Sequence, residues 1–349
     1  TAAVIAVFAL LLLVLVGVVF VLSPATMLAN LTKQNVTFFV ALIFIYYFIA
    51  TIVPIDKIIG RFYPILGGLL LFMTFGIFFG MLFNGHGILS DINFAQQHPK
   101  ELPMWPLMFI TLSCGAVSGF HSTQSPLMSR CLTNEKYGRR VFYCAMISEG
   151  IIALIWATVG LTLYEPGALQ TIITEGTAAL VVDETSRNLL GTFGGFLAIL
   201  GVIILPITSG DTAFRSARLV ISEAFHLSQK AVPKRLMIAI PLFVVGFIIS
   251  QVNFAVIWRY FGWSNQTLAT LVLWSSAVYL VKQGKFHWIA TVPAVFLTAV
   301  VVTFIFYADI GFQLPYITAV ILGIIAAVLT FILFLIYAKR KHLVIVKHA

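Results

Sequence analysis

Charged residues are scarce in this 349-residue sequence, and cysteines are scarcer still. Asp, Glu, Lys and Arg make up 9% of the residues, whereas 60% are hydrophobic and the mean hydropathy is +1.04. A soluble protein of this length would need far more charge, and its 31 Phe residues would leave large apolar patches in water. The composition therefore excludes a soluble fold and predicts an all-α, polytopic transmembrane helical bundle.

Other absences argue against an enzyme. The three cysteines, Cys114, Cys131 and Cys144, have no metal-ligand spacing and no even pairing, so we predict no redox or metal role for them. GxSxG, HExxH, Walker A and Cys-x-x-Cys motifs are missing, so we expect no cofactor and no ATP-driven mechanism. The net charge of +9 comes from short Lys and Arg clusters between apolar runs, a pattern that does not fit a nucleic-acid partner.

Apolar runs long enough to cross about 30 Å of hydrocarbon recur along the whole chain. Lipid cannot hydrogen-bond the backbone, so such runs are expected to be helices. We predict a single transmembrane domain over residues 1–349, with residues 211–235 as a cytoplasmic amphipathic helix that ends near Pro233. The ten predicted spans are 2–22, 37–54, 64–83, 104–125, 141–164, 191–210, 236–254, 264–280, 287–307 and 315–338.

The distribution of basic residues predicts the orientation. One set of alternate connections, together with the C-terminal tail, holds 17 Lys and Arg residues, and the opposite set holds only Lys33, Lys100, Arg187 and Arg259. Basic residues are concentrated on the cytoplasmic side of membrane proteins, so both ends of this chain are predicted to be cytoplasmic. The first span lacks a charged leader and a cleavage site, which favours a helix of a longer chain over a signal peptide.

Polar side chains inside a predicted span are costly and mark candidate sites. The fourth span contains the sequence SGFHSTQSP, in which glycine and proline weaken the helix, so we expect an interruption whose backbone groups bind ions or anionic groups. The alternative is that glycine allows close packing and the hydroxyls bond to their own backbone. His121 is a hypothetical proton relay or a satisfied interior histidine. The candidate substrate-binding residues here are Gly119, His121, Ser122, Thr123, Gln124 and Ser125.

Two further places are candidates for ion or proton coupling. Glu149 lies two turns inside the fifth span with no cation within one helical turn, so it either carries a proton or makes a structural hydrogen bond. The sixth span ends in LPITSGD, where proline removes a backbone hydrogen bond near Thr208 and Ser209. Alternatively, Ser209 or Asp211 caps the next helix, and Asp211 pairs with Arg215 at i,i+4.

A fourth polar place lies at the start of the eighth span. Trp258, Tyr260 and Trp263 are typical of an aromatic belt at the membrane interface. Asn265 and Gln266 follow them, and these two amides either line a polar path for the substrate or, in the case of Asn265, simply cap the helix.

Three separated motifs in this sequence resemble the carbon-starvation protein A (CstA) family. They are SGFHSTQSPLMSRCLTNEKYGRRVFYCAMISEGIIALIW, ILPITSGDTAFRSARL and RYFGWSNQTLATLVLW. The resemblance implies a bacterial inner-membrane carrier linked to the uptake of small peptides and pyruvate, driven by the proton gradient. Family members begin with several more helices and a GAGP motif, both absent here, so we expect this chain to lack the first part of the family's fold.

The resemblance also implies a fold and a function. The family is similar to the amino acid/polyamine carriers, which have a leucine-transporter-like inverted-repeat fold, and residues 104–125 would then be the sixth core helix, with the first two core helices absent. The leading hypothesis is a proton-coupled symporter for small peptides or pyruvate, with the membrane lipid as its other partner. The alternatives are a channel or a membrane sensor, and the coupling ion is either a proton or sodium.

Overall fold

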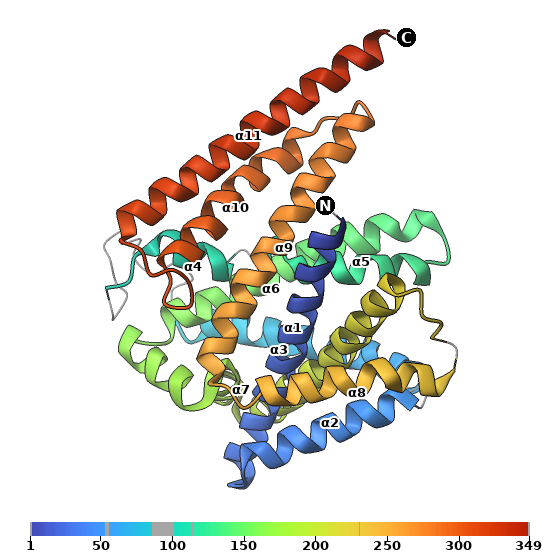
Figure 1. The fold of residues 1–349 in the computed structure, drawn as a ribbon. Coiled ribbons are helices and arrows are strands. Elements are labelled where there is room, and N and C mark those ends of the chain that lie inside the picture. The colour runs from blue at the N-terminus through green and yellow to red at the C-terminus, as the bar shows by residue number, and fades with distance from the viewer. Residues whose placement is uncertain (1, 53–55, 86–100, 113–114, 230, 348–349) are drawn as a thin grey trace. The chain divides into compact units, whose positions relative to one another are not determined.

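The computed structural model describes residues 2–52, 56–85, 101–112, 115–229 and 231–347. Every regular element in these ranges is helical (Figure 1). A short 3₁₀ turn (Glu135–Tyr137) and a π-helical segment (Arg139–Cys144) precede the sixth α-helix. The α-helices are α1 (Ala2–Thr32), α2 (Val36–Ile52), α3 (Asp56–Phe83), α4 (Met104–Leu112), α5 (Gly119–Cys131), α6 (Ala145–Thr162), α7 (Pro166–Ala224), α8 (Val232–Ile249), α9 (Phe254–Lys282), α10 (Trp288–Tyr307) and α11 (Tyr316–Lys347).

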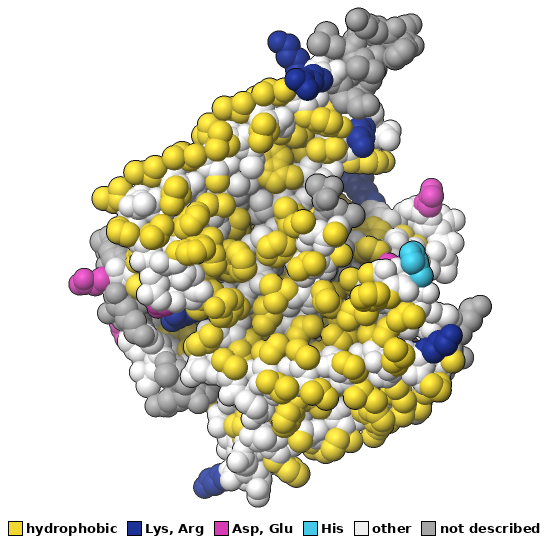
Figure 2. All heavy atoms as spheres, in the orientation of Figure 1, with side chains coloured by type: hydrophobic (Ala, Val, Ile, Leu, Met, Phe, Trp, Pro, Cys, Tyr) yellow, Lys and Arg dark blue, Asp and Glu magenta, His cyan; other side chains and the backbone are white. Residues whose placement is uncertain are grey.

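The helices carry an apolar surface suited to lipid. Apolar side chains cover much of the face in Figure 2, and charged side chains there are few. Six stretches of the described chain are long and apolar enough to cross a membrane, and α2 is an apolar helix of shorter length. Each predicted span overlaps one or two of the helices, while the count of ten stays a prediction. Residues 53, 54, 113 and 114, and therefore Cys114, lie outside the described residues.

One compact unit comprises Thr1–Leu12, Leu102–Gly138 and Trp258–Ala349. Its last two helices, α10 and α11, run side by side (Figure 1), and Gly323 lies so close to α10 that a Cβ there would overlap the Thr303 hydroxyl. Ile110 of α4 packs against Val300 and Phe304 of α10 in a buried apolar cluster. These contacts fix α4 against α10, next to the point where the fourth predicted span is interrupted.

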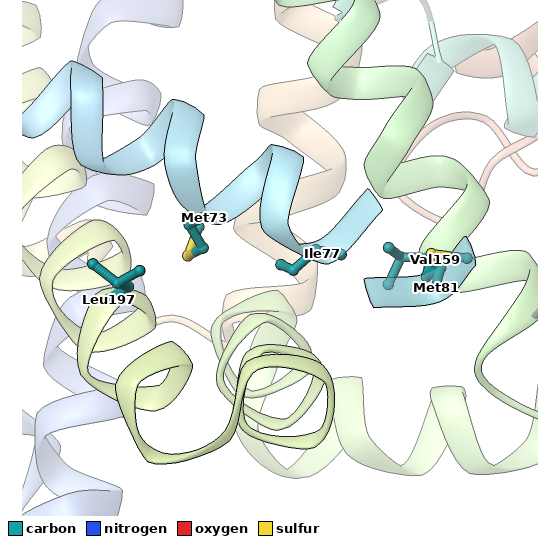
Figure 3. Packing of buried hydrophobic residues seen from close by; sticks show 5 residues of the cluster. All are labelled: Met73, Ile77, Met81, Val159 and Leu197. Atoms are coloured by element: carbon teal, nitrogen blue, oxygen red, sulfur yellow. The ribbon is translucent and has the colours of Figure 1, made fainter. Parts of the chain in front are cut away.

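The second compact unit comprises Leu13–Glu101 and Arg139–Ile257. Figure 3 shows one part of its core, where Met73, Ile77 and Met81 of α3 pack with Val159 of α6 and Leu197 of α7. These side chains are buried at the i, i+4, i+8 positions of α3, a spacing that places them along one face of the helix.

An aromatic cluster forms another part of the second unit, around Phe214 of α7. The Phe214 ring lies 5.8 Å from Phe44 of α2 and 5.4 Å from Phe243 of α8, centroid to centroid. Gly17 of α1 and Gly246 of α8 both approach this ring so closely that neither position has room for a Cβ. Four helices therefore meet at Phe214.

Helix α7 is not a straight rod, because Gly191 has a φ of 65°, which a right-handed helix does not contain. A Cβ on Gly194 would overlap the carbonyl oxygen of Ser186, although residues eight apart in a straight helix are about 12 Å apart. The chain therefore turns back at Gly191, where the sixth predicted span begins. The structure differs from the predicted helix over 211–235, because α7 continues to Ala224 and Pro233 lies in the first turn of α8, where proline is favoured.

Candidate functional site

The fourth predicted span is interrupted in the structure. Helix α4 ends at Leu112, residues 115–118 are not α-helical, and α5 begins at Gly119. Ser118 is the N-cap of α5, and its hydroxyl accepts a hydrogen bond from the Phe120 amide at 3.2 Å. This arrangement satisfies one of the amides that the first turn of a helix leaves without an intrahelical partner.

Asn265 of α9 is hydrogen-bonded to the start of α5. Its side-chain oxygen accepts hydrogen bonds from the Ser118 hydroxyl and the Phe120 amide, both at 2.9 Å. Gly119 makes this contact possible, because a Cβ there would overlap the Asn265 carbonyl oxygen and lie 2.9 Å from Cβ of Leu268. The sequence-based alternative that Asn265 caps its own helix is wrong, because Asn265 lies well inside α9 and contributes to the cap of α5.

The two amides on α9 are completely buried. Asn265 and Gln266 have no exposed surface, and the Gln266 backbone carbonyl accepts a hydrogen bond from the Thr270 hydroxyl at 2.7 Å. The neighbouring Ser264 is equally buried, and its hydroxyl has no hydrogen-bond partner within the described residues. A polar segment therefore lies inside the first unit, directly against the interruption of the fourth span.

The hydroxyls of α5 bond to their own helix. Ser122 donates to the Gly119 carbonyl at 2.6 Å, Thr123 to the Phe120 carbonyl at 2.7 Å and Ser125 to the His121 carbonyl at 2.7 Å. The alternative of close packing at Gly119 and back-bonded hydroxyls is therefore confirmed for this helix. His121 and the Gln124 side chain, which donates to the Thr123 hydroxyl at 3.3 Å, are half-buried.

The second unit holds the other candidates. Asp211 is buried in α7 and accepts a hydrogen bond from Arg215 at 2.9 Å, which confirms the predicted i,i+4 pair. The capping alternative is wrong, because α7 continues through Ser209 and Asp211 without a break. Thr208 is buried and donates to the Leu205 carbonyl at 2.9 Å, whereas Ser209 is half-buried.

Glu149 lies in α6 and is half-buried. It follows the π-helical segment Arg139–Cys144. Such π-helical distortions are rare in proteins, and many of those that occur lie at functional sites. Gly119, His121, Ser122, Thr123, Gln124, Ser125, Asn265 and Gln266 belong to the first unit, while Glu149, Thr208, Ser209 and Asp211 belong to the second. The hypothesis that the two sets share one cavity stays a prediction.

Sequence reasoning missed two polar features. Ser118 precedes the weak helical stretch as an N-cap residue should, and that position was its signal. The other feature is the hydroxyl of Tyr164, which lies 2.8 Å from the buried Thr185 hydroxyl across the α6–α7 connection. No sequence pattern predicts this pair of hydroxyls, because only the fold brings them together.

Within the described ranges, no three His, Cys, Asp or Glu side chains gather in a group that would hold a metal ion. Cys131 and Cys144 are free and exposed. The candidate positions hold hydroxyls, amides, the Asp211–Arg215 ion pair on α7 and the half-buried carboxyl group of Glu149 on α6. Hydroxyl and amide groups of this kind can hydrogen-bond a solute or its carboxylate.

The apolar helices with buried polar groups between them define the class: this is an all-helical, multi-pass membrane protein. The sequence profile of the family described as "Carbon starvation protein CstA" matches residues 1–188 and 163–304. The chain therefore belongs to the CstA family, as the three sequence motifs predict.

Three relatives illustrate the similarity to known proteins. An uncharacterized membrane protein of Haemophilus influenzae is 40% identical, over 49% of this chain and 61% of the relative. The peptide transporter CstA of Campylobacter jejuni is 27% identical, over 56% of this chain and 37% of the relative. The pyruvate/proton symporter BtsT of Escherichia coli is 41% identical, over 19% of this chain and 10% of the relative. The chain thus spans less than two thirds of the length of each, and no solved structure matches it.

Proposed function

We propose that the full-length protein containing this chain is a secondary active transporter that takes up small peptides or pyruvate with a proton across the bacterial inner membrane. The observation that carries this proposal is the start of α5, where an interrupted helix inside an apolar bundle is held by the buried Asn265. Related proteins named as peptide transporters and as a pyruvate/proton symporter support it. In the proposed orientation both ends of the chain are cytoplasmic.

The proposed substrate site lies at the first turns of α5. The N-terminal end of a helix carries a partial positive charge and amide donors, which favour the carboxylate that peptides and pyruvate share. Gly119, His121, Ser122, Thr123, Gln124, Ser125, Asn265 and Gln266 would form this site. The hydroxyls of Ser122, Thr123 and Ser125 donate their hydrogens to backbone carbonyls. Toward a solute they would therefore act as hydrogen-bond acceptors, which can bind its N–H groups.

Proton coupling is assigned to buried and half-buried polar groups of the second unit. Glu149, Thr208, Ser209 and Asp211 would hold the coupling ion, with the Asp211 carboxylate as the charged group. The proposed fold is the leucine-transporter-like inverted repeat, in which the interrupted fourth span is the sixth core helix. The interruption between α4 and α5 supports this correspondence, because discontinuous helices form the binding sites of such carriers.

The test is uptake into proteoliposomes that contain the full-length protein. We expect labelled pyruvate or labelled dialanine to accumulate when the outside is acidic, and a protonophore to abolish that accumulation. Preloaded unlabelled substrate should accelerate entry by exchange. A channel would pass substrate without such exchange and without accumulation against a gradient, and a sensor would pass neither compound. Failure to accumulate either compound under the pH gradient would refute the proposal.

A further inference from the structure

Tyr47 of α2 is a buried polar residue to which no role has been assigned so far. Its side chain has no exposed surface, and its hydroxyl has no hydrogen-bond partner among the described residues. The ring is fixed by its neighbours, with centroids 6.0 Å from Phe44, 5.8 Å from Phe214 and 6.4 Å from Phe243. A donor that is enclosed without an acceptor is costly, so this hydroxyl requires an explanation.

The hydroxyl lies directly on α7, beside the candidate coupling residues. A Cβ on Gly210 would overlap the Tyr47 hydroxyl oxygen, so only glycine lets the phenol reach the α7 backbone. The next residue is Asp211, whose charge acts on the phenol and whose carboxylate is held by Arg215 at 2.9 Å. The partnerless hydroxyl and the buried carboxylate are therefore neighbours in the same unit.

The chemistry of the two groups is complementary in one protonation state. A charged carboxylate only accepts hydrogen bonds, and the Arg215 guanidinium donates one to it at 2.9 Å. A protonated carboxyl group has one donor and one acceptor, and so has a phenol hydroxyl. A neutral Asp211–Tyr47 pair would thus satisfy both groups, and it would also remove the unsatisfied hydroxyl that the charged state leaves behind.

We propose that Tyr47 is a positioning residue for proton coupling, the hydrogen-bond partner that Asp211 takes when a proton neutralises it and Arg215 releases it. The carboxylate gains one proton from water, Arg215 keeps its charge and Tyr47 keeps its own proton. Asp211 returns to Arg215 when it loses the proton. This inference rests on the proposed transport function and names a residue in its coupling step.

The surroundings of the phenol restrict which groups can take part. On α7 the charged group that acts on the phenol is Asp211, which pairs with Arg215, and on α2 the titratable neighbour is Tyr46. The contacts from α1 and α8 are apolar, from Phe20 against Gly210 and from Phe243 against the Tyr47 ring. Asp211 is therefore the acidic group that acts on the hydroxyl.

The decisive variant is Tyr47→Phe in the full-length protein, with Tyr46→Phe as the matched control on the neighbouring, less buried tyrosine. Labelled pyruvate and labelled dialanine uptake would be measured in proteoliposomes as a function of external pH. Loss of the partner of the neutral carboxyl group should make protonation harder, so the midpoint of the pH profile should shift to lower pH by about one unit, a tenfold change in proton concentration. Tyr46→Phe should leave the midpoint in place.

A purely structural role gives the opposite result. Deleting a hydroxyl without a partner from an apolar cluster would then keep or raise the melting temperature and leave the pH profile unchanged. An unshifted midpoint, or a shift to higher pH, in Tyr47→Phe overturns the role of Tyr47 while the transport function stands. A wild-type protein that accumulates neither compound overturns both. In an Asp211→Asn background, exchange of preloaded substrate should not change further on Tyr47→Phe, and an added loss there would also overturn the pairing.

Discussion

Gly119 is the position where one added methyl group should disturb the candidate site most. In Gly119→Ala the new Cβ would overlap the Asn265 backbone carbonyl and lie 2.9 Å from Cβ of Leu268 and 3.2 Å from the Ala269 amide nitrogen. Two of these three atoms belong to the backbone of α9, so no side-chain rotation relieves the contact. Helix α5 must move away from α9 by roughly 1 Å to restore ordinary contact distances.

The expected loss of stability follows from that movement. Overpacking of a tight contact costs about 1–3 kcal/mol. The hydrogen bonds from Ser118 and the Phe120 amide to Asn265, both 2.9 Å long, would stretch beyond useful length, and each contributes about 1 kcal/mol. The higher helix propensity of alanine offsets at most about 1 kcal/mol of this loss of stability. We therefore expect Gly119→Ala to destabilise the protein by about 3 kcal/mol and to impair uptake.

The assay is thermal unfolding of the full-length protein in detergent, paired with uptake in proteoliposomes. Gly138→Ala is the control, since a Cβ at Gly138 meets nothing within 4 Å, and its stability should change by no more than about 0.5 kcal/mol. A Gly119→Ala protein that unfolds and transports like Gly138→Ala would refute the inferred contact between α5 and α9.

Three further substitutions test other contacts by thermal unfolding. Tyr164→Phe leaves the buried Thr185 hydroxyl without the partner seen at 2.8 Å, so it should cost about 1–3 kcal/mol, and adding Thr185→Val should recover most of that loss; an equally unstable double variant would contradict the pairing. Gly323→Ala places a Cβ into α10 and should destabilise the α10–α11 hairpin by about 1–3 kcal/mol, whereas a neutral effect would argue against this close crossing. Arg259→Gln removes an exposed ion pair with Asp309 and should cost less than about 1 kcal/mol; a larger loss would mean that this pair is better shielded than its exposure indicates.

The sequence by itself determined the class of this protein and indicated that its fourth span is interrupted. Apolar runs with little charge require lipid around them, and lipid requires helices, so composition decided the environment and the secondary structure together. An interruption of the fourth span was also predicted, but the structure places it at residues 115–118, ahead of the clustered hydroxyl residues, which form the continuous helix α5. The pair of Asp211 and Arg215 followed from helical spacing alone.

Only the tertiary structure decided which groups meet. Ser118 and Asn265 are 147 positions apart in the chain. One of the two alternatives for Asn265, a cap on its own helix, is wrong, because residue spacing describes only the helix that contains Asn265 and not the helix packed against it. The sequence predicted that the sixth span begins at Gly191, but it did not reveal the positive φ by which the chain turns back there. In the sequence, Tyr47 does not differ from the other aromatic residues of a membrane helix. Only the packing of α2 on α7 shows that its hydroxyl lies against Gly210. The local sequence pattern predicts helices because the backbone hydrogen bonds of a helix join residues that are close in sequence. The candidate sites depend instead on contacts between segments that are distant in sequence, and the periodicity of hydrophobic residues does not specify those contacts.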